Sequence, residues 1–163
     1  MKTYNILFLC TGNSARSIMA EAVASATTNG RLNGYSAGSH PTGKVNPFAI
    51  EQIKTLNYQK MNLRSKSWDE FSEPSAPKMD FIITVCDNAA REVCPVWPGN
   101  PVTAHWGFPD PAAVEGSDEE KRASFRMVFL GIKRRVELLA SLPLDTLDSL
   151  SIQAELRKIG NIK

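Results

Sequence analysis

A short segment near the beginning of the chain limits the folds that the chain can adopt. Cys10 is followed by five residues, one of them Gly12, and then by Arg16 and Ser17. The preceding residues 4–9 are rich in strand formers. The following residues place four apolar side chains on one face of a helix: Ile18, Met19, Ala22 and Val23. A strand, a loop of small polar residues and a helix form the first half of a βαβ unit, so the segment predicts an α/β domain.

The same loop has the composition of an anion site. Successive backbone N–H groups in such a loop can surround one tetrahedral oxyanion, and the positive end of the following helix attracts it. Arg16 can grip two oxygens with its planar guanidinium. This positive field is expected to lower the pKa of the Cys10 thiol and to make it a nucleophile. A buried, inert Cys10 is the alternative, and the arginine at this interval argues against it. The predicted oxyanion-binding residues are Thr11, Gly12, Asn13, Ser14, Ala15, Arg16 and Ser17.

Three further segments have the pattern of strands. Residues 33–38 are bounded by turn residues, and residues 80–86 form an unbroken β-branched and apolar run suited to a parallel sheet covered on both faces. Residues 93–111 are rich in proline and are expected to be an ordered loop with one short strand at 102–105. Strands that alternate with helices predict a mainly parallel sheet.

Helix signals separate these strands and follow the last of them. A helix is expected at 47–56, with Pro47 in its first turn, where a missing N–H costs little. Ser117 has the capping chemistry to begin a long helix that ends before Pro143. The buried stripe of this helix is expected to contain Phe125, Val128, Phe129, Ile132, Val136 and Leu139.

The end of the chain predicts one more helix. Asp145 is expected to cap it, and four apolar residues lie broadly to one side: Leu147, Leu150, Ala154 and Leu156. We find no internal repeat and no linker. We therefore expect a single domain over residues 1–163, with a core at about 4–142 and a helical extension at about 145–163.

Charge and cysteine content exclude several classes of protein. Nineteen basic and seventeen acidic residues give a net charge of +2, too little to argue for nucleic acid or an anionic membrane as a partner. No apolar run is long enough to span a bilayer. The opening residues 1–9 are interpreted as a strand of the mature protein, which predicts a cytoplasmic location. Three cysteines are an odd number, unlike a secreted disulfide framework.

Several motifs together resemble the low-molecular-weight tyrosine phosphatase superfamily, from about Tyr4 to about Leu139. They are the loop itself, Glu21, residues 36–38 and the segment His-Trp-Gly-Phe-Pro-Asp-Pro at 105–111. The resemblance implies a four-stranded parallel sheet with helices on both faces, in a single three-layer domain. It also implies that Asp110 is the general acid that protonates the departing oxygen.

The superfamily contains tyrosine phosphatases and arsenate reductases, and the residues favour a reductase. Phosphatases of this group place aromatic residues after the Asp-Pro pair, whereas this chain continues with two alanines. They also tend to have bulky apolar residues in the loop, where this chain has Thr11 and Ser14, and many have a second cysteine at the position of Ala15. Residues 86–95, which contain Cys86 and Cys94, are instead similar to the redox region of thioredoxin-coupled arsenate reductases.

That resemblance implies a relay of three thiols. Cys10 forms a covalent adduct with arsenate while Asp110 acts as the acid, Cys86 then attacks Cys10 as arsenite leaves, and Cys94 finally attacks Cys86. Phosphate and sulfate are the expected competing anions. No bound cofactor is expected, and thioredoxin, or glutathione with glutaredoxin, is the expected external reductant. Three alternatives stay open: a tyrosine phosphatase that uses Cys10, Arg16 and Asp110, a non-catalytic oxyanion or redox sensor, and a zinc site made by Cys86, Cys94 and His105.

Support of the loop is expected from Glu21, Ser36 and Lys66. Related reductases hold a monovalent cation behind the loop, through residues matching Asn13, Glu21 and Ser36 and an additional acidic residue. Lys66 falls near that acidic position, so its ammonium is expected to replace the cation, and no metal is expected. A solvated surface lysine is the alternative. His40, His105 and the three tryptophans are interpreted as structural.

Overall fold

The computed structural model describes residues 2–57, 62–87, 89 and 97–162. Its sheet has four parallel strands in the order β2-β1-β3-β4. They are β1 (Tyr4–Cys10), β2 (Leu32–Gly38), β3 (Phe81–Thr84) and β4 (Val102–His105). The predicted four-stranded parallel sheet is confirmed. The strand expected at 80–86 is shorter than predicted because its ladder ends at Thr84, although the Val85 N–H still donates to the Leu9 carbonyl at 2.9 Å.

Helices connect and follow the strands as the sequence indicated. The α-helices in the described residues are α1 (Arg16–Thr27), α2 (Pro47–Lys54), α4 (Asp118–Ala140) and α5 (Ser149–Gly160). Short 3-10 helices are η1 (Trp68–Phe71), η2 (Pro111–Ala113) and η3 (Leu144–Thr146). No helix among these is long and apolar enough to cross a membrane.

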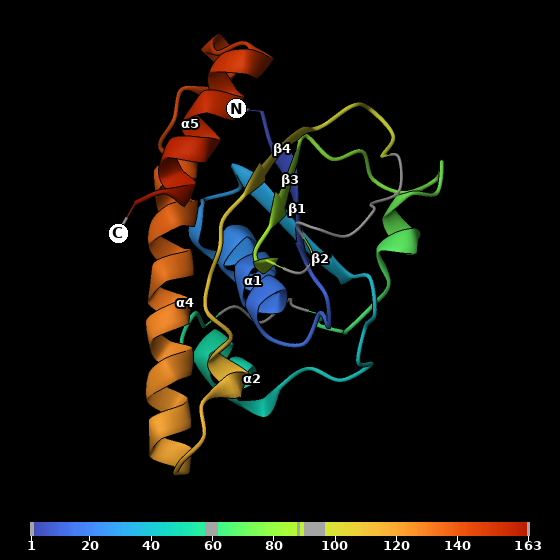
Figure 1. Cartoon of the computed structure of the whole chain (residues 1–163). Coiled ribbons are helices and arrows are strands. Elements are labelled where there is room, and N and C mark those ends of the chain that lie inside the picture. Colours follow the sequence, from blue (N-terminus) through green and yellow to red (C-terminus); the bar gives the residue numbers. More distant parts are fainter. Residues whose placement is uncertain (1, 58–61, 88, 90–96, 163) are drawn as a thin grey trace.

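Both faces of the sheet are buried, which explains the continuous apolar run of β1. Ile6 and Phe8 point into a large core formed with α1, α4 and α5, while Leu7 and Leu9 point into a smaller core with Phe71 of η1. Figure 1 shows α1 and α4 on one side of the sheet and the green η1 segment on the other. Each fully buried side chain of this size stabilises the fold by about 1.5–3 kcal/mol.

Helix α4 follows its sequence pattern closely. Ser117 accepts from the Glu120 N–H and the Glu120 side chain accepts from the Ser117 N–H, which completes a capping box. The buried residues of the helix are the six predicted ones, namely Phe125, Val128, Phe129, Ile132, Val136 and Leu139. The stripe is long enough to pack α4 along α1 and α2 (Figure 1).

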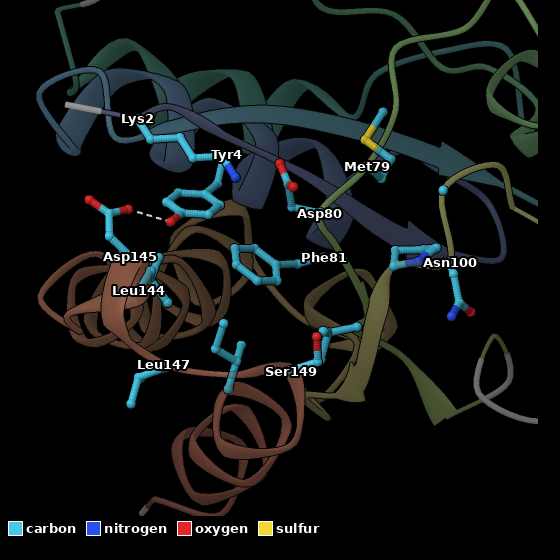
Figure 2. Close-up of a pocket in the computed structure, with 14 residues that line it drawn as sticks. Lys2, Tyr4, Met79, Asp80, Phe81, Asn100, Leu144, Asp145, Leu147 and Ser149 are labelled. Atoms are coloured by element: carbon cyan, nitrogen blue, oxygen red, sulfur yellow. Dashed lines mark hydrogen bonds between the residues drawn. The ribbon is translucent and has the colours of Figure 1, made fainter.

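The last helix differs from the prediction. Asp148, and not Asp145, caps α5, by accepting from the Ser151 N–H at 2.7 Å. Asp145 lies in η3 and accepts a hydrogen bond from the Tyr4 hydroxyl, as Figure 2 shows, so its carboxylate is engaged with β1. The predicted apolar face is also wrong, because Leu150 is 79% exposed. The buried residues of α5 are Ile152, Leu156 and Ile159.

Helix α5 packs on the edge strand β4. The Trp106 indole N–H, which is fully buried, donates to the Leu156 carbonyl at 2.9 Å. Gln153 donates to the Thr103 carbonyl at 3.4 Å. The contact covers an edge that would otherwise expose unpaired backbone groups.

Candidate active site

The nucleophile candidate Cys10 is the last residue of β1, where the chain passes very close to β2. Cys10 lies opposite Gly38 in the parallel register. A Cβ at Gly38 would lie 2.4 Å from the Thr11 carbonyl oxygen and 2.8 Å from that of Cys10. Only glycine therefore permits the loop to begin directly against β2.

The loop after Cys10 directs its carbonyl groups outward. The carbonyls of Thr11, Gly12 and Ser14 accept hydrogen bonds of 2.8–3.0 Å from backbone N–H groups of the segment 40–46. Because a trans peptide points its N–H away from its carbonyl, the following N–H groups are turned toward the opposite side, which is the inside of the loop. The N-terminus of α1 adds further N–H groups to this side. Ala15 is its N-cap residue and has no polar side chain that could accept hydrogen bonds from the first N–H groups of the helix.

Asn13 supports the bend of the loop from behind. It has a left-handed backbone (φ 45°) and a fully buried side chain. Its amide donates to the Ser17 hydroxyl at 2.8 Å and accepts from the Lys66 N–H at 2.9 Å. The side chains of Asn13 and Ser17 thus bond to each other within the fold.

A cavity of about 240 Å³ opens inside the loop. Its lining contains both thiols and the predicted acid: Cys10, Thr11, Gly12, Ser14, Ala15, Arg16, Cys86, Asp110 and Ala112. Arg16 is held at its rim, where one guanidinium nitrogen donates to the Phe108 carbonyl at 3.0 Å and another lies 4.0 Å from the Asp110 carboxylate. The cavity therefore combines a fixed positive charge with inward N–H groups, which suits a small tetrahedral anion.

Asp110 stands at the mouth of this cavity. Its side chain is about half exposed, and one oxygen accepts from the Ala112 N–H at 2.9 Å as the N-cap of η2. That bond fixes the Asp110 carboxyl group near Arg16. The second carboxyl oxygen of Asp110 is the one that lies 4.0 Å from the guanidinium. The position agrees with the geometry that a general acid needs, which is access to both the bound anion and the solvent.

The structure brings Cys86 to Cys10, 76 residues apart in the sequence. Cys86 follows β3 and is buried, with its sulfur 3.4 Å from the Ala89 N–H that donates to it and 3.8 Å from the Thr11 hydroxyl. Both thiols are free. The predicted meeting of the two residues at one sheet edge follows from the parallel strands β1 and β3, which end side by side. Cys94 lies outside the described residues.

A hydrogen bond between the sulfurs of Cys10 and Cys86 affects the pKa of both thiols. This bond is the largest cause that lowers the pKa of Cys86 to about 5, and nearby N–H groups assist it against burial. The pKa of Cys10 is raised, first by the bond to Cys86 and then by burial, although Arg16 and the Gly12 N–H act in the opposite direction. The expected lowering of the Cys10 pKa is therefore wrong for the resting pair. The bond between the sulfurs therefore acts in opposite directions on the two thiols, lowering the pKa of Cys86 and raising that of Cys10.

The three predicted support residues converge behind the loop. The Lys66 ammonium donates to the Arg64 carbonyl at 2.8 Å and lies 3.4 Å from both the Glu21 carboxylate and the Ser36 hydroxyl. Ser36 donates to the same Glu21 oxygen at 2.5 Å. Lys66 is only 7% exposed, so the alternative of a solvated surface lysine is wrong. Burial lowers the pKa of Lys66, whereas Glu21 opposes the shift.

Other polar contacts at the carboxyl edge of the sheet were missed in the sequence. His105, interpreted as structural, bonds to Thr84 and Asp87, and the Phe108 carbonyl orients Arg16. Only the register of β3 with β4, which pairs Thr84 with His105, could have indicated the first contact. His40 is exposed and its ring contacts Ser39.

The alternative of a zinc site made by Cys86, Cys94 and His105 is only partly described, because Cys94 lies outside the described residues. In the described part of the chain, no three His, Cys, Asp or Glu side chains gather as a metal site.

Comparison with known proteins agrees with this geometry. The family model described as low molecular weight phosphotyrosine protein phosphatase matches residues 5–154. Among curated proteins, the arsenate reductase of Halalkalibacterium halodurans strain C-125 is 41% identical over 135 residues, which covers 83% of this chain and 94% of that protein.

Solved structures share the fold. The arsenate reductase of Archaeoglobus fulgidus DSM 4304 superposes with a TM-score of 0.64 at 26% identity, over 84% of this chain and 99% of the other. The thioredoxin-dependent arsenate reductase of Corynebacterium glutamicum superposes with a TM-score of 0.62 at 24% identity, over 88% of this chain and 64% of the other.

Proposed function

The chain belongs to the low molecular weight phosphotyrosine protein phosphatase family, and we propose that within this family it is an arsenate reductase. The observation that supports this most directly is the contact between Cys10 and Cys86 inside the anion loop. Hydrolysis of a phosphate ester needs one nucleophile, one arginine and one acid. A second thiol within hydrogen-bond distance of the nucleophile has a use when the nucleophile must be released as a disulfide. The curated relative named above, an arsenate reductase, supports the same choice.

The first step forms a bond between the Cys10 sulfur and arsenic. Arg16 and the loop N–H groups hold three oxygens of arsenate, and the fourth oxygen faces Asp110. The thiol proton of Cys10 and the acid proton of Asp110 both go to this oxygen, which leaves as water. The thiol proton can pass through the adjacent Cys86 sulfur. The product is a covalent thiol–arsenate adduct, with arsenic still in its oxidised state.

The second step moves two electrons. The Cys86 thiolate attacks the Cys10 sulfur, a sulfur–sulfur bond forms, and the sulfur–arsenic bond breaks with its electron pair on arsenic. Arsenic is reduced to arsenite, which takes up a proton from water, and the two thiols are oxidised to a disulfide. The low pKa of Cys86, about 5, supports this role because it keeps the attacking sulfur ionised at neutral pH.

Recycling needs a third thiol or an external one. We assign Cys94 to the attack on Cys86, which frees Cys10 and carries the disulfide away from the loop; the motif Cys86–Cys94 in the sequence supports this step. Thioredoxin is the reductant named for the Corynebacterium glutamicum protein and is our first candidate, with glutathione and glutaredoxin as the alternative. Such thiol chemistry fits the cytoplasm, where the resting thiols stay reduced.

Two competing functions share the loop. A tyrosine phosphatase would use Cys10, Arg16 and Asp110, but the segment after Asp110 contributes Ala112 to the cavity and offers no aromatic ring to hold a phenol. A non-catalytic sensor would bind the anion without turnover. Both make the same prediction about anion binding, so binding alone does not separate them from a reductase.

A disulfide map separates the three functions. Reduced protein is mixed with arsenate or with phosphate, the free thiols are blocked, and disulfides are located by mass spectrometry. A reductase gives Cys10–Cys86 or Cys86–Cys94 with arsenate only, together with arsenite, and a Cys86→Ser variant gives no such disulfide while it still hydrolyses an aryl phosphate. Thiols that stay reduced in the wild-type protein, with and without added glutathione, would contradict the reductase. Aryl phosphate turnover would then indicate a phosphatase, and anion binding alone would indicate a sensor.

A further inference from the structure

Three polar side chains form a chain of hydrogen bonds at the carboxyl ends of β3 and β4. Thr84 and His105 end the neighbouring strands β3 and β4 and are paired in the register. The Thr84 hydroxyl lies 2.7 Å from Nδ1 of His105, and Nε2 of His105 lies 3.0 Å from the Asp87 carboxylate. Because a carboxylate only accepts hydrogen bonds, Nε2 carries the hydrogen and donates a hydrogen bond to Asp87.

The surroundings keep this arrangement in place. A Cβ at Gly107 would lie 3.1 Å from Nε2 of His105 and 3.4 Å from the Asp87 carboxylate. The backbone after β4 therefore passes directly against the pair, and a larger residue would crowd it. His105 is fixed by β3 on one side of its ring and fixes Asp87 on the other.

Asp87 connects this pair to the chemistry. It directly follows Cys86, and the Cys86 sulfur accepts from the Ala89 N–H. The bond from His105 therefore holds the side chain of a residue that lies in the sequence between the sulfur and its N–H donor. The Asp87 side chain is 75% exposed and that of His105 is 38% exposed. An exposed pair of this kind contributes little to stability.

We propose that His105, acting through Asp87, is a positioning residue that holds Cys86 in line for attack on Cys10. The proposal rests on the proposed function for its place in the reaction. The bonds made and broken remain those of the second step, and the pair exchanges no proton or electron with the thiols. Its loss is expected to slow that step, because a displacement of the order of 1 Å can lower a rate by about 100-fold.

The test compares the two steps in single turnovers. His105→Ala and Asp87→Ala are each expected to slow arsenate-dependent formation of the Cys10–Cys86 disulfide by about 10- to 100-fold. Aryl phosphate hydrolysis by Cys10, which uses no atom of the pair, is expected to change by less than about 3-fold. The double variant is expected to be no slower than either single variant, since both remove one interaction. His105→Gln, which can still donate to Asp87, is expected to recover most of the rate.

A control and a second oxidant make the result decisive. Arg122→Ala removes another exposed ion pair, to Glu51 at 2.9 Å, and is expected to leave both rates unchanged. Diamide forms the Cys10–Cys86 disulfide without arsenate, and the same order of rates is expected with it. If the wild-type protein reacts with diamide but not with arsenate, the proposed function fails while the positioning role is still measured. The role is overturned if His105→Ala leaves the disulfide rate unchanged with both reagents, if it slows both steps equally, or if the two single effects add.

Discussion

Two cavities at opposite edges of the sheet differ in their charge, and the one at the amino edge is larger than the one around the anion loop. The carboxyl edge holds about 240 Å³ around Cys10 and Arg16. The amino edge holds about 410 Å³ next to Tyr4, Asp80 and Asp145 (Figure 2). There, the carboxylates would repel an oxyanion, and each already accepts a hydrogen bond, from the Asn5 N–H or from the Tyr4 hydroxyl. Charge and the direction of backbone groups, rather than volume, locate the chemistry.

Strand direction accounts for the difference. All four strands are parallel, so the loops that follow β1 and β3 leave from the same edge and place Cys10 and Cys86 together. The N-terminus of α1 points its partial positive charge to that edge. At the amino edge, the Tyr4 hydroxyl of β1 donates to the Asp145 carboxylate of η3. These two polar groups therefore bond to each other and are not directed toward a ligand.

Removal of the nucleophile should give the largest contrast between the edges. Cys10→Ser is expected to lower both arsenate-dependent thiol oxidation and aryl phosphate hydrolysis by roughly 10⁴-fold or more, because a serine hydroxyl gives up its proton far less readily than a thiol and is a weaker nucleophile. The matched change at the amino edge, Asp145→Asn, is expected to leave both rates within about 2-fold. Comparable losses in the two variants would contradict the assignment of chemistry to the carboxyl edge.

The acid should give the next largest effect. Asp110→Asn keeps the N-cap acceptor for Ala112 but cannot donate a proton to the departing oxygen, so the first step is expected to slow by roughly 10²- to 10³-fold. Inhibition by phosphate is expected to persist, because Arg16 and the loop are intact. Asp80→Asn at the other edge serves as control. An unchanged rate for Asp110→Asn would show that another group supplies the proton.

The support residues behind the loop, Glu21, Ser36 and Lys66, are expected to affect the free energy of unfolding. Lys66→Ala leaves the Glu21 carboxylate without its ammonium, and the free energy of unfolding in urea is expected to fall by about 3 kcal/mol. Added K⁺ is expected to restore part of this loss by binding Glu21 and Ser36. Lys66→Met, which fills the space, is the control and should not respond. A wild-type protein that responds to K⁺ as strongly as Lys66→Ala would contradict the replacement of the cation by lysine.

The smallest effect is expected at the amino edge. Tyr4→Phe removes one hydrogen bond and should lower stability by about 1 kcal/mol with no change in activity. The bond to Asp145 raises the Tyr4 pKa from 10.0 to about 12. The folded state therefore holds this proton more tightly, and its contribution is complete below pH 10.0 and is lost as the pH rises toward 12. Urea unfolding across this range should show the alkaline decline in the wild-type protein and a weaker decline in Tyr4→Phe; equal declines would exclude Tyr4 as the cause.

The sequence by itself determined the features that depend on neighbours along the chain. The interval from Cys10 to Arg16 predicted the anion loop, and the spacing of apolar residues predicted every buried residue named for α4. Periodicity and capping act within one or two turns, so they are visible in the sequence. The last helix shows where this stops: Asp145 and Asp148 are both acceptable caps, and the Tyr4 hydroxyl, 141 residues away from Asp145, selects between them.

Only the tertiary structure decided the properties that depend on contacts across the sheet. The hydrogen bond to Cys86 and burial raise the pKa of Cys10, which reverses the direction expected from its loop alone. Lys66 reaches Glu21 and Ser36, and His105 reaches Asp87, through strand order and register. Ionisation and side-chain partners depend on the local field and on burial, and both arise only when distant segments are packed together.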